Sequence, residues 1–243
     1  MAGIDTEENM PEQVINNDME KSVVLLTDID NTLYDFVDFY ARAFRSMVHL
    51  LASDLGESED DLIEDFRRLF QERGSVDQSY LIEYLKAVKN LPTERVHFLT
   101  ARGRRAFDLT RQKYLRPYAE IPMVLKALHD AGVRIVAVTN APYHYAFTRL
   151  RSIGVLDFFF GLIAWEGCEA PNEIAARKYM KIRDQAGRRL RCFRTFEKQM
   201  SKPSSLPFEL VRDYFGVRGE YYALGDSVTK DLVPARVLDA KLI

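Results

Sequence analysis

The sequence predicts an α/β fold: a parallel sheet with helices on both faces, interrupted near its N-terminus by an inserted α-helical segment. Apolar runs of strand length alternate with helical patterns along most of the chain. Short connections between alternating strands and helices are typical of parallel sheets with right-handed crossovers. Residues 36–115 depart from this alternation, because they show helical periodicity only.

The first predicted strand is the apolar run 23–26. In the inserted segment, apolar side chains recur every three or four residues in the stretches 36–51, 62–70 and 80–88. This spacing predicts an amphipathic helical bundle. Ser58 stands ahead of three acids, which predicts a helix start, because serine caps helices and acids are stabilised by the helix dipole.

After the inserted segment, helices and strands alternate. We expect helices at 120–130, 145–153 and 207–215, and strands at 133–139, 161–166 and 221–225. Each helix is closely followed by a glycine, the residue that most often ends a helix. Consecutive strands should therefore lie parallel in one sheet.

Asp28 and Asp30 are the most informative residues, because they follow the first strand directly and stand one residue apart. Two carboxylates at the end of a buried strand are costly to desolvate, unless a cation or a reaction offsets that cost. Later segments place polar side chains at comparable positions: Thr139 and Asn140, Lys202, and Asp226 with Asp231. Ligands of open α/β sheets bind beyond the carboxyl ends of the strands, so we expect these residues to converge on one crevice.

These segments, in this order, resemble the four motifs of the haloacid dehalogenase superfamily of aspartate-nucleophile hydrolases. The resemblance covers roughly residues 22–243, apart from an unusual stretch before Lys202. It implies a Rossmann-like core made of residues 21–35 and 116–243, and a helical cap of the C1 type made of residues 36–115. Because the cap segment interrupts a βα unit directly after the catalytic loop, we expect it above the active site.

The resemblance implies a role for each motif residue. Asp28 would be the nucleophile that forms an aspartyl-phosphate. Asp30 would protonate the leaving oxygen and then activate the hydrolytic water, a division of labour that suits two neighbouring carboxylates in different environments. The phosphate would be bound by Thr139, Asn140 and Lys202.

The resemblance also implies Mg²⁺ as the cofactor. Asp28 and Asp226 offer the hard oxygen ligands that Mg²⁺ prefers, and the backbone carbonyl of Asp30 would complete the set. Asp231 is either a further carboxylate of the outer metal shell or an acid at a helix start.

We therefore predict a Mg²⁺-dependent phosphatase acting on a small phosphorylated metabolite. A sugar-phosphate mutase shares the same four motifs and stays an alternative. A second alternative is a non-catalytic module that keeps the fold and binds an anionic partner. The dehalogenase branch is disfavoured because it does not require the second acid, whereas Asp30 is present here.

Three other segments carry predictions. Residues 1–20 contain acids but no lysine or arginine, and little apolar periodicity, which predicts a disordered tail. Residues 167–200 form a basic insertion within the core, which either steers anionic substrates or is only a solvated surface. The chain stops at residues 241–243, where a further strand has barely begun, so we expect the last strand to be truncated.

The composition limits the partners and the compartment. A net charge of −2 offers no large cationic surface for nucleic acid or an anionic membrane. The longest apolar run is too short to span a bilayer. Two cysteines are too few for a disulfide framework, so we expect a cytoplasmic protein. The oligomeric state cannot be predicted from the sequence.

Overall fold

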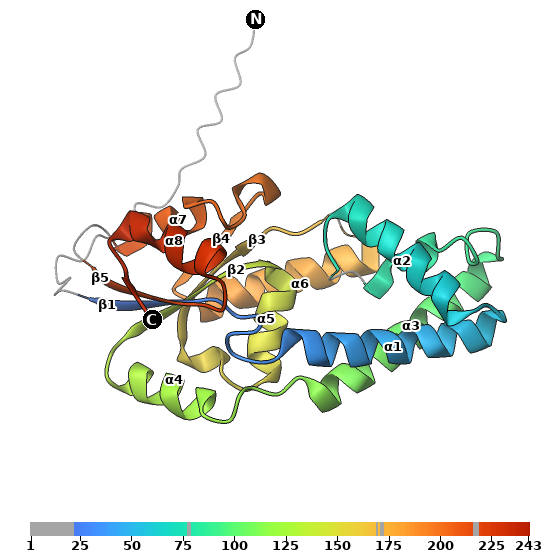
Figure 1. Cartoon of the computed structure of the whole chain (residues 1–243), viewed down its shortest axis with the longest axis horizontal. Helices are drawn as coiled ribbons and strands as arrows, with labels where there is room; N and C mark the ends of the chain where they lie inside the picture. The colour runs from blue at the N-terminus through green and yellow to red at the C-terminus, as the bar shows by residue number, and fades with distance from the viewer. Residues whose placement is uncertain (1–21, 77–78, 169, 171–172, 216–218) are drawn as a thin grey trace, which may run out of the picture.

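The computed structural model describes residues 22–76, 79–168, 170, 173–215 and 219–243. They form a six-stranded parallel sheet, from one end of which a group of helices projects (Figure 1). The predicted disordered tail, residues 1–20, lies outside the described residues. The strand order is β4-β3-β2-β1-β5-β6. The strands are β1 (Val23–Thr27), β2 (Arg134–Pro142), β3 (Phe159–Trp165), β4 (Cys192–Phe196), β5 (Glu220–Leu224) and β6 (Lys241–Leu242).

Helices cover both faces of the sheet, as predicted. On one face, Leu25 of β1 packs in a cluster with α4 (Ile121–Asp130), α5 (Tyr143–Ser152) and α6 (Glu173–Arg189). On the other face, Val24 and Leu26 pack with α7 (Leu206–Phe215) and the short α8 (Val233–Ala235). Successive side chains of a strand point to opposite faces, so an entirely apolar run suits a strand that is buried on both sides. The predicted parallel α/β fold is confirmed.

β1 lies at the centre of the sheet, between β2 and β5. The chain order reverses at this point, because β2 to β4 lie on one side of β1 and β5 and β6 on the other. Such a reversal opens a crevice beyond the carboxyl ends of the strands, and ligands bind there in open α/β sheets. The residues directly after β1 therefore stand where a site is expected.

The basic stretch 167–200 contains regular structure that the sequence analysis did not identify. It holds helix α6 and strand β4, which pairs with β3 at the edge of the sheet. Only the two end residues of β4, Cys192 and Phe196, are buried. An edge strand needs no continuous apolar run, and this explains why the segment carries no clear strand signal.

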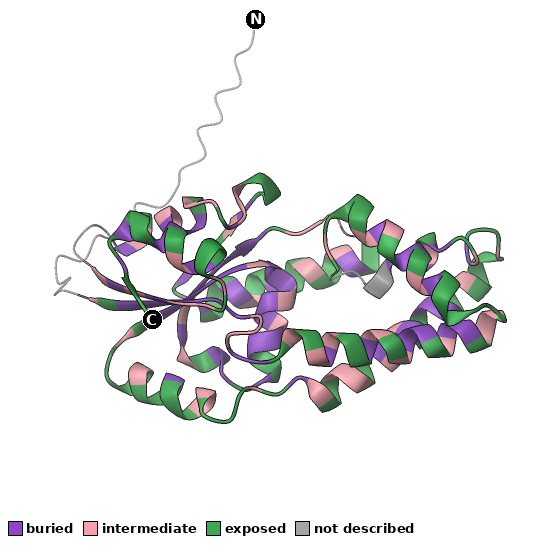
Figure 2. Cartoon of the chain, in the orientation of Figure 1, coloured by how far each residue is buried: buried purple, intermediate pink, exposed green. Residues whose placement is uncertain are grey.

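The helices that project from the sheet are α1 (Phe36–Leu55), α2 (Glu59–Arg73) and α3 (Thr93–Tyr114). They enclose an apolar cluster of their own, which includes Leu51, Phe66 and Leu99. In Figure 2 the buried residues of α1 form a stripe along the helix. Ser58 caps α2 by accepting a hydrogen bond from the backbone N–H of Asp61, as the sequence indicates.

The helical pattern at residues 80–88 does not produce an α-helix. The chain forms a six-residue 3₁₀ helix, η1 (Ser79–Tyr84), followed by turns. The backbone N–H of Lys86 donates to the buried carboxylate of Asp65 at 2.5 Å. The carboxylate of Asp65 accepts the hydrogen bond that a backbone carbonyl would accept in a helix. A tertiary contact therefore replaces the helix that the local periodicity predicts.

The remaining elements are short. They comprise the 3₁₀ turns η2 (Leu156–Phe158), η3 (Lys198–Met200) and η5 (Arg236–Leu238), and the π-helical turn η4 (Val228–Leu232). The two residues of β6 pair in parallel with β5. In the described part of the chain, no helix has both the length and the apolar character needed to cross a bilayer.

Candidate active site

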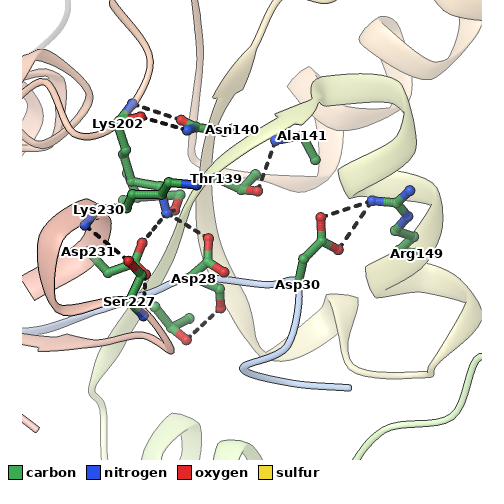
Figure 3. A network of polar contacts seen from close by, with 12 residues as sticks. Asp28, Asp30, Thr139, Asn140, Ala141, Arg149, Lys202, Ser227, Lys230 and Asp231 are labelled. Atoms are coloured by element: carbon green, nitrogen blue, oxygen red, sulfur yellow. Dashed lines mark hydrogen bonds and ion pairs between the residues drawn. The ribbon is translucent and has the colours of Figure 1, made fainter. Parts of the chain in front are cut away.

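Asp28 lies directly after β1, at the point where the central strand ends. Its backbone N–H donates to the carbonyl of Leu224 at 3.0 Å, which fixes the start of the loop against β5. The residue is only 9 % exposed, and one carboxylate oxygen, Oδ1, accepts a hydrogen bond from Lys202 Nζ at 2.6 Å (Figure 3). The nucleophile expected from the sequence is therefore buried and paired with a cation.

Lys202 reaches Asp28 across 174 positions of sequence. Its Nζ also donates to the carbonyl of Val138 at 2.8 Å and to the carboxylate of Asp231. An ammonium group has three N–H donors, and these three acceptors use all of them. Burial alone would lower the pKa of Lys202, but the two carboxylates outweigh it and raise that pKa. Lys202 is thus held as a fixed, charged group.

Burial has the opposite effect on Asp28, because it penalises the ionised carboxylate. It raises the pKa of Asp28 to about 7, against the attraction of Lys202 and with a further contribution from the nearby Asp231. Three carboxylates, those of Asp28, Asp226 and Asp231, stand near the single ammonium of Lys202, so the cluster has more acidic groups than this lysine can neutralise. Such an excess favours binding of an additional cation beside Asp28.

Asn140 holds the loop that carries Lys202. Its amide nitrogen donates to the backbone carbonyl of Lys202 at 2.9 Å, and its amide oxygen accepts from the backbone N–H of Lys202 at 2.8 Å. The neighbouring Thr139 is buried, and its hydroxyl accepts from the backbone N–H of Ala141 at 3.1 Å. In this structure both side chains organise the backbone around Lys202 and the end of β2.

Asp226 and Asp231 follow β5 and meet Asp28. The three carboxylates each offer one oxygen, and these oxygens all lie within 4.8 Å of one another. Asp231 is buried in the turn η4, where its Oδ2 accepts from the backbone N–H of Ser227 at 3.0 Å. A Cβ atom on Gly225 would lie 2.4 Å from Cβ of Asp231. Only glycine at this position lets Asp231 approach the end of β5 so closely.

Asp30 points away from Asp28, toward helix α5 (Figure 3). Nη1 of Arg149 donates to both of its carboxylate oxygens at 3.1 Å, and the hydroxyl of Tyr34 donates to one of them. Ile29, between the two aspartates, is fully buried in the core. The chain has already left β1, which ends at Thr27, and the loop turns the two carboxylates toward different partners.

Arg149 is a site residue that the sequence analysis missed. Its side chain is 4 % exposed, and its guanidinium lies over the rings of Phe36, Phe39 and Tyr145 at 4.9, 5.7 and 5.6 Å from their centroids. A buried cation requires an anionic partner. The sequence did contain a signal for this residue. Arg149 lies on the apolar face of α5, three residues after the buried Ala146.

Comparison with known proteins identifies the family. The model of the haloacid dehalogenase-like hydrolases matches residues 24–239 of the chain. The chain belongs to this hydrolase family. The described fold also resembles a 2-haloacid dehalogenase from Pseudomonas syringae pv. tomato, with a TM-score of 0.55 and 18 % sequence identity over 91 % of this chain and 85 % of that one.

A curated relative of this hydrolase is the glyceraldehyde 3-phosphate phosphatase of Methanopyrus kandleri. The two sequences are 28 % identical over 173 residues, which are 68 % of this chain and 69 % of the relative.

The donor set of this hydrolase fits Mg²⁺. Three carboxylates face one ammonium, all the candidate ligand atoms are oxygens, and Asp226 is exposed. Mg²⁺ prefers oxygen ligands and keeps several waters, which an open side of the cluster allows.

The tertiary structure thus brings Asp28, Lys202, Asp226 and Asp231 together and places Asn140 against Lys202. The side chain of Asp30 stands apart from this group, with Arg149.

Proposed function

We propose that this hydrolase is a Mg²⁺-dependent phosphatase, which cleaves the phosphate monoester of a small molecule through an aspartyl-phosphate intermediate. The observation that carries the proposal is the buried contact of Lys202 with Asp28 and Asp231, next to the exposed carboxylate of Asp226. This arrangement offers a nucleophile, a fixed cation and a set of oxygen ligands at one strand end. Phosphoryl transfer needs those three parts.

In the first step, an oxygen of the Asp28 carboxylate attacks phosphorus and the bond from phosphorus to the ester oxygen breaks. Lys202 stabilises the negative charge on the phosphoryl oxygens through its fixed ammonium. Asp30 gives its proton to the leaving oxygen. Thr139 and Asn140 lie at the end of β2, and we assign to them the remaining contacts of the phosphate.

In the second step, a water molecule attacks phosphorus and loses its proton to Asp30. The acyl phosphate bond breaks, which releases inorganic phosphate and restores the Asp28 carboxylate. Asp30 thus alternates between acid and base, and the guanidinium of Arg149 holds its carboxylate in place between turnovers.

Asp28, Asp226 and the backbone carbonyl of Asp30 would hold the Mg²⁺ ion, with Asp231 beside them. Bound there, the ion would supply positive charge to the phosphoryl oxygens as a Lewis acid. Asp231 already accepts hydrogen bonds from Lys202 and from the backbone of Ser227. We therefore assign Asp231 to the outer shell of the ion rather than to direct ligation.

The helices α1 to α3 are proposed to act as the cap of this site. Their own apolar cluster supports a unit that can move as one body. Polar contacts join the end of α2 to the core: Nζ of Lys198 donates to the carbonyls of Arg73 and Gly74, at 3.2 and 3.1 Å, and Sγ of Cys168 donates to the same carbonyl of Arg73 at 4.0 Å. Closure of such a cap excludes water and completes the substrate site.

Two observations favour a phosphate ester over a halogenated acid as the substrate. The second acid, Asp30, is present and held in a defined orientation by Arg149 and Tyr34. The curated relative of the chain is a phosphatase of glyceraldehyde 3-phosphate. A mutase would use the same residues, and it differs in forming an isomerised ester instead of inorganic phosphate.

The test is release of inorganic phosphate by the purified protein with and without Mg²⁺. Asp28→Asn should lower turnover at least about a thousandfold with little loss of stability, since the amide is nearly isosteric but a very poor nucleophile. Mass spectrometry of the quenched wild type should find the phosphoryl group on Asp28. Asp213→Asn, an exposed acid on α7, is the matched control and should keep full activity.

Phosphatase activity of Asp28→Asn within tenfold of the wild type would contradict the assignment of the nucleophile. Isomerisation of a sugar phosphate without phosphate release would identify a mutase. Binding of phosphate esters without either reaction would identify a non-catalytic module.

A further inference from the structure

Lys198, in the turn η3, joins the end of helix α2 to the core. Its Nζ donates to the backbone carbonyls of Arg73 and Gly74, at 3.2 and 3.1 Å. These carbonyls stand at the C-terminal end of α2, where a helix has no backbone donors of its own and where its dipole favours a cation. Lys198 thus caps α2 from outside the helix, across 125 positions of sequence from Arg73.

A glycine and a tryptophan provide the space for this ammonium. Gly74 has a φ of 64°, and a Cβ atom at this position would overlap Nζ of Lys198. On the core side, the same Nζ lies 5.6 Å from the centroid of the Trp165 ring, a distance at which a cation is attracted to an indole. Trp165 is buried at the end of β3. The ammonium therefore bridges a helix end and a strand end.

The lysine also stands four residues before Lys202. The turn between them is closed by a hydrogen bond from the backbone N–H of Ser201 to the carbonyl of Lys198, at 3.0 Å. Lys202 itself is held by Asn140 and by two buried carboxylates. The end of α2 is therefore tied to the segment that carries the ammonium of the active site.

The contact is polar and exposed, so it can open and close. Lys198 is exposed, and within the described ranges it has no carboxylate partner; the side chain of the adjacent Glu197 accepts from Gln199 instead. Hydrogen bonds of this kind change an equilibrium constant by about fivefold. The contact favours one arrangement of the helices and still breaks on the time scale of a turnover.

We propose that Lys198 is a latch, which holds the cap in the position seen here and so sets the fraction of enzyme molecules that can retain substrate. The inference rests on the proposed function, in which α1 to α3 form the cap. An enzyme whose binding-competent state is less populated has a weaker apparent affinity by the same factor. Lys198 is then a positioning residue, because it acts through the cap.

The first test is the kinetics of Lys198→Met with p-nitrophenyl phosphate. The methionine keeps an apolar side chain over Trp165 but has no N–H donors. We expect KM to rise about three- to fivefold. The value of kcat should stay within about twofold, because Lys202 keeps its own contacts. Lys181→Met, an exposed lysine on α6, is the control and should have wild-type kinetics.

The second test approaches the same contact from the cap. Gly74 and Gly56 end α2 and α1, with φ values of 64° and 71°, so alanine should strain both backbones to a similar degree. A Cβ atom at Gly74 would displace the ammonium of Lys198, whereas nothing lies within 4 Å of a Cβ atom at Gly56. Gly74→Ala should therefore raise KM as Lys198→Met does, and Gly56→Ala should not. In the double variant of Gly74 and Lys198, KM should rise no further, because both changes remove one contact.

Trp165 allows the contact to be observed without catalysis. It is the only tryptophan in the sequence, so the emission of the protein at tryptophan wavelengths reports on the position of the Lys198 ammonium. Gly74→Ala should change that emission, although it alters the cap and not the core. Gly56→Ala should leave it unchanged. Thermal unfolding checks the fold of each variant.

An unchanged KM in folded Lys198→Met would overturn the inference. Equal rises of KM in Gly74→Ala and Gly56→Ala would also overturn it, since they would indicate backbone strain alone. So would a fall of kcat at constant KM, because Lys198 would then act on Lys202 and not on the cap. No phosphate release by the wild type would overturn the proposed function. In that case the emission still decides on the contact, and equal emission of Gly74→Ala and the wild type would exclude it.

Discussion

Only Ile29 separates Asp28 from Asp30, yet the two aspartates belong to two differently built halves of the site. Asp28 follows β1 and is buried among groups from three other segments of the core. These segments are β2, the loop before α7, and the end of β5 with the turn that follows it. Asp30 is 23 % exposed at its side chain and is held by Arg149, whose guanidinium lies against aromatic rings of α1 and α5.

The difference shows how one motif supports two tasks. On the Asp28 side, a fixed ammonium and neighbouring carboxylates surround the proposed positions of the phosphate and the cation. On the Asp30 side, a single buried arginine holds the acid and lines a cavity of about 150 Å³ between the projecting helices and the core. In the proposed mechanism the first half supplies the nucleophile and the second half supplies the acid and base.

The largest effect is expected on the Asp28 side, from Lys202→Met. Removing the cation leaves the carboxylates of Asp28 and Asp231 buried without a positive charge beside them, which should lower the free energy of unfolding by about 3–5 kcal/mol and abolish turnover. Urea denaturation measures the first effect and phosphate release the second. The control is Lys230→Met, an exposed lysine nearby. A loss below about 1 kcal/mol would show that the two carboxylates do not depend on Lys202.

Gly225→Ala tests whether Asp231 can shift without loss of stability or of Mg²⁺ activation. The new Cβ would lie 2.4 Å from Cβ of Asp231, so we expect a loss of about 2–3 kcal/mol of stability and at least tenfold weaker Mg²⁺ activation. Gly187→Ala in α6 is the control, since nothing lies within 4 Å of its added Cβ. Normal Mg²⁺ activation of Gly225→Ala would mean that Asp231 does not influence the ion.

Arg149→Met tests the Asp30 side. Without its guanidinium, Asp30 loses its fixed orientation but remains present, so kcat should fall about 10- to 100-fold, less than the roughly 10²- to 10⁴-fold that full loss of a general acid costs, with a smaller change in KM. The loss should be smaller for p-nitrophenyl phosphate, whose leaving oxygen needs little protonation, than for an alkyl phosphate. An equal loss on both esters would indicate a purely structural role. Arg151→Met, an exposed arginine of the same helix, is the control.

The smallest expected effect concerns His144 and the pH dependence of stability. Its pKa in the folded protein is about 3, and in the unfolded chain it returns to about 6.5. Between pH 3 and pH 6.5, His144 is therefore protonated in the unfolded chain and neutral in the folded protein. The free energy of unfolding falls as the pH decreases through this range. His144→Phe should remove about 2.6 kcal/mol of the loss between pH 7.5 and pH 4.5. Identical pH profiles of the two proteins would show that folding leaves the pKa of His144 unchanged.

The sequence by itself determined the parallel α/β core and the meeting of Asp28, Lys202, Asp226 and Asp231. Both follow from local patterns, because strand periodicity and short connections define the sheet, and parallel strands end at one edge. Helix bounds such as Ile121–Asp130 and Leu206–Phe215 lie within a residue of the expected ones for the same reason.

Only the tertiary structure decided the other half of the site. Strand β4, the short η1 in place of a longer helix, the pairing of Arg149 with Asp30 and the cavity around His144 all depend on which helix faces meet. A buried charge, an edge strand or an unpaired imidazole is recognised by its neighbours in space, and those neighbours are not determined by periodicity along the chain.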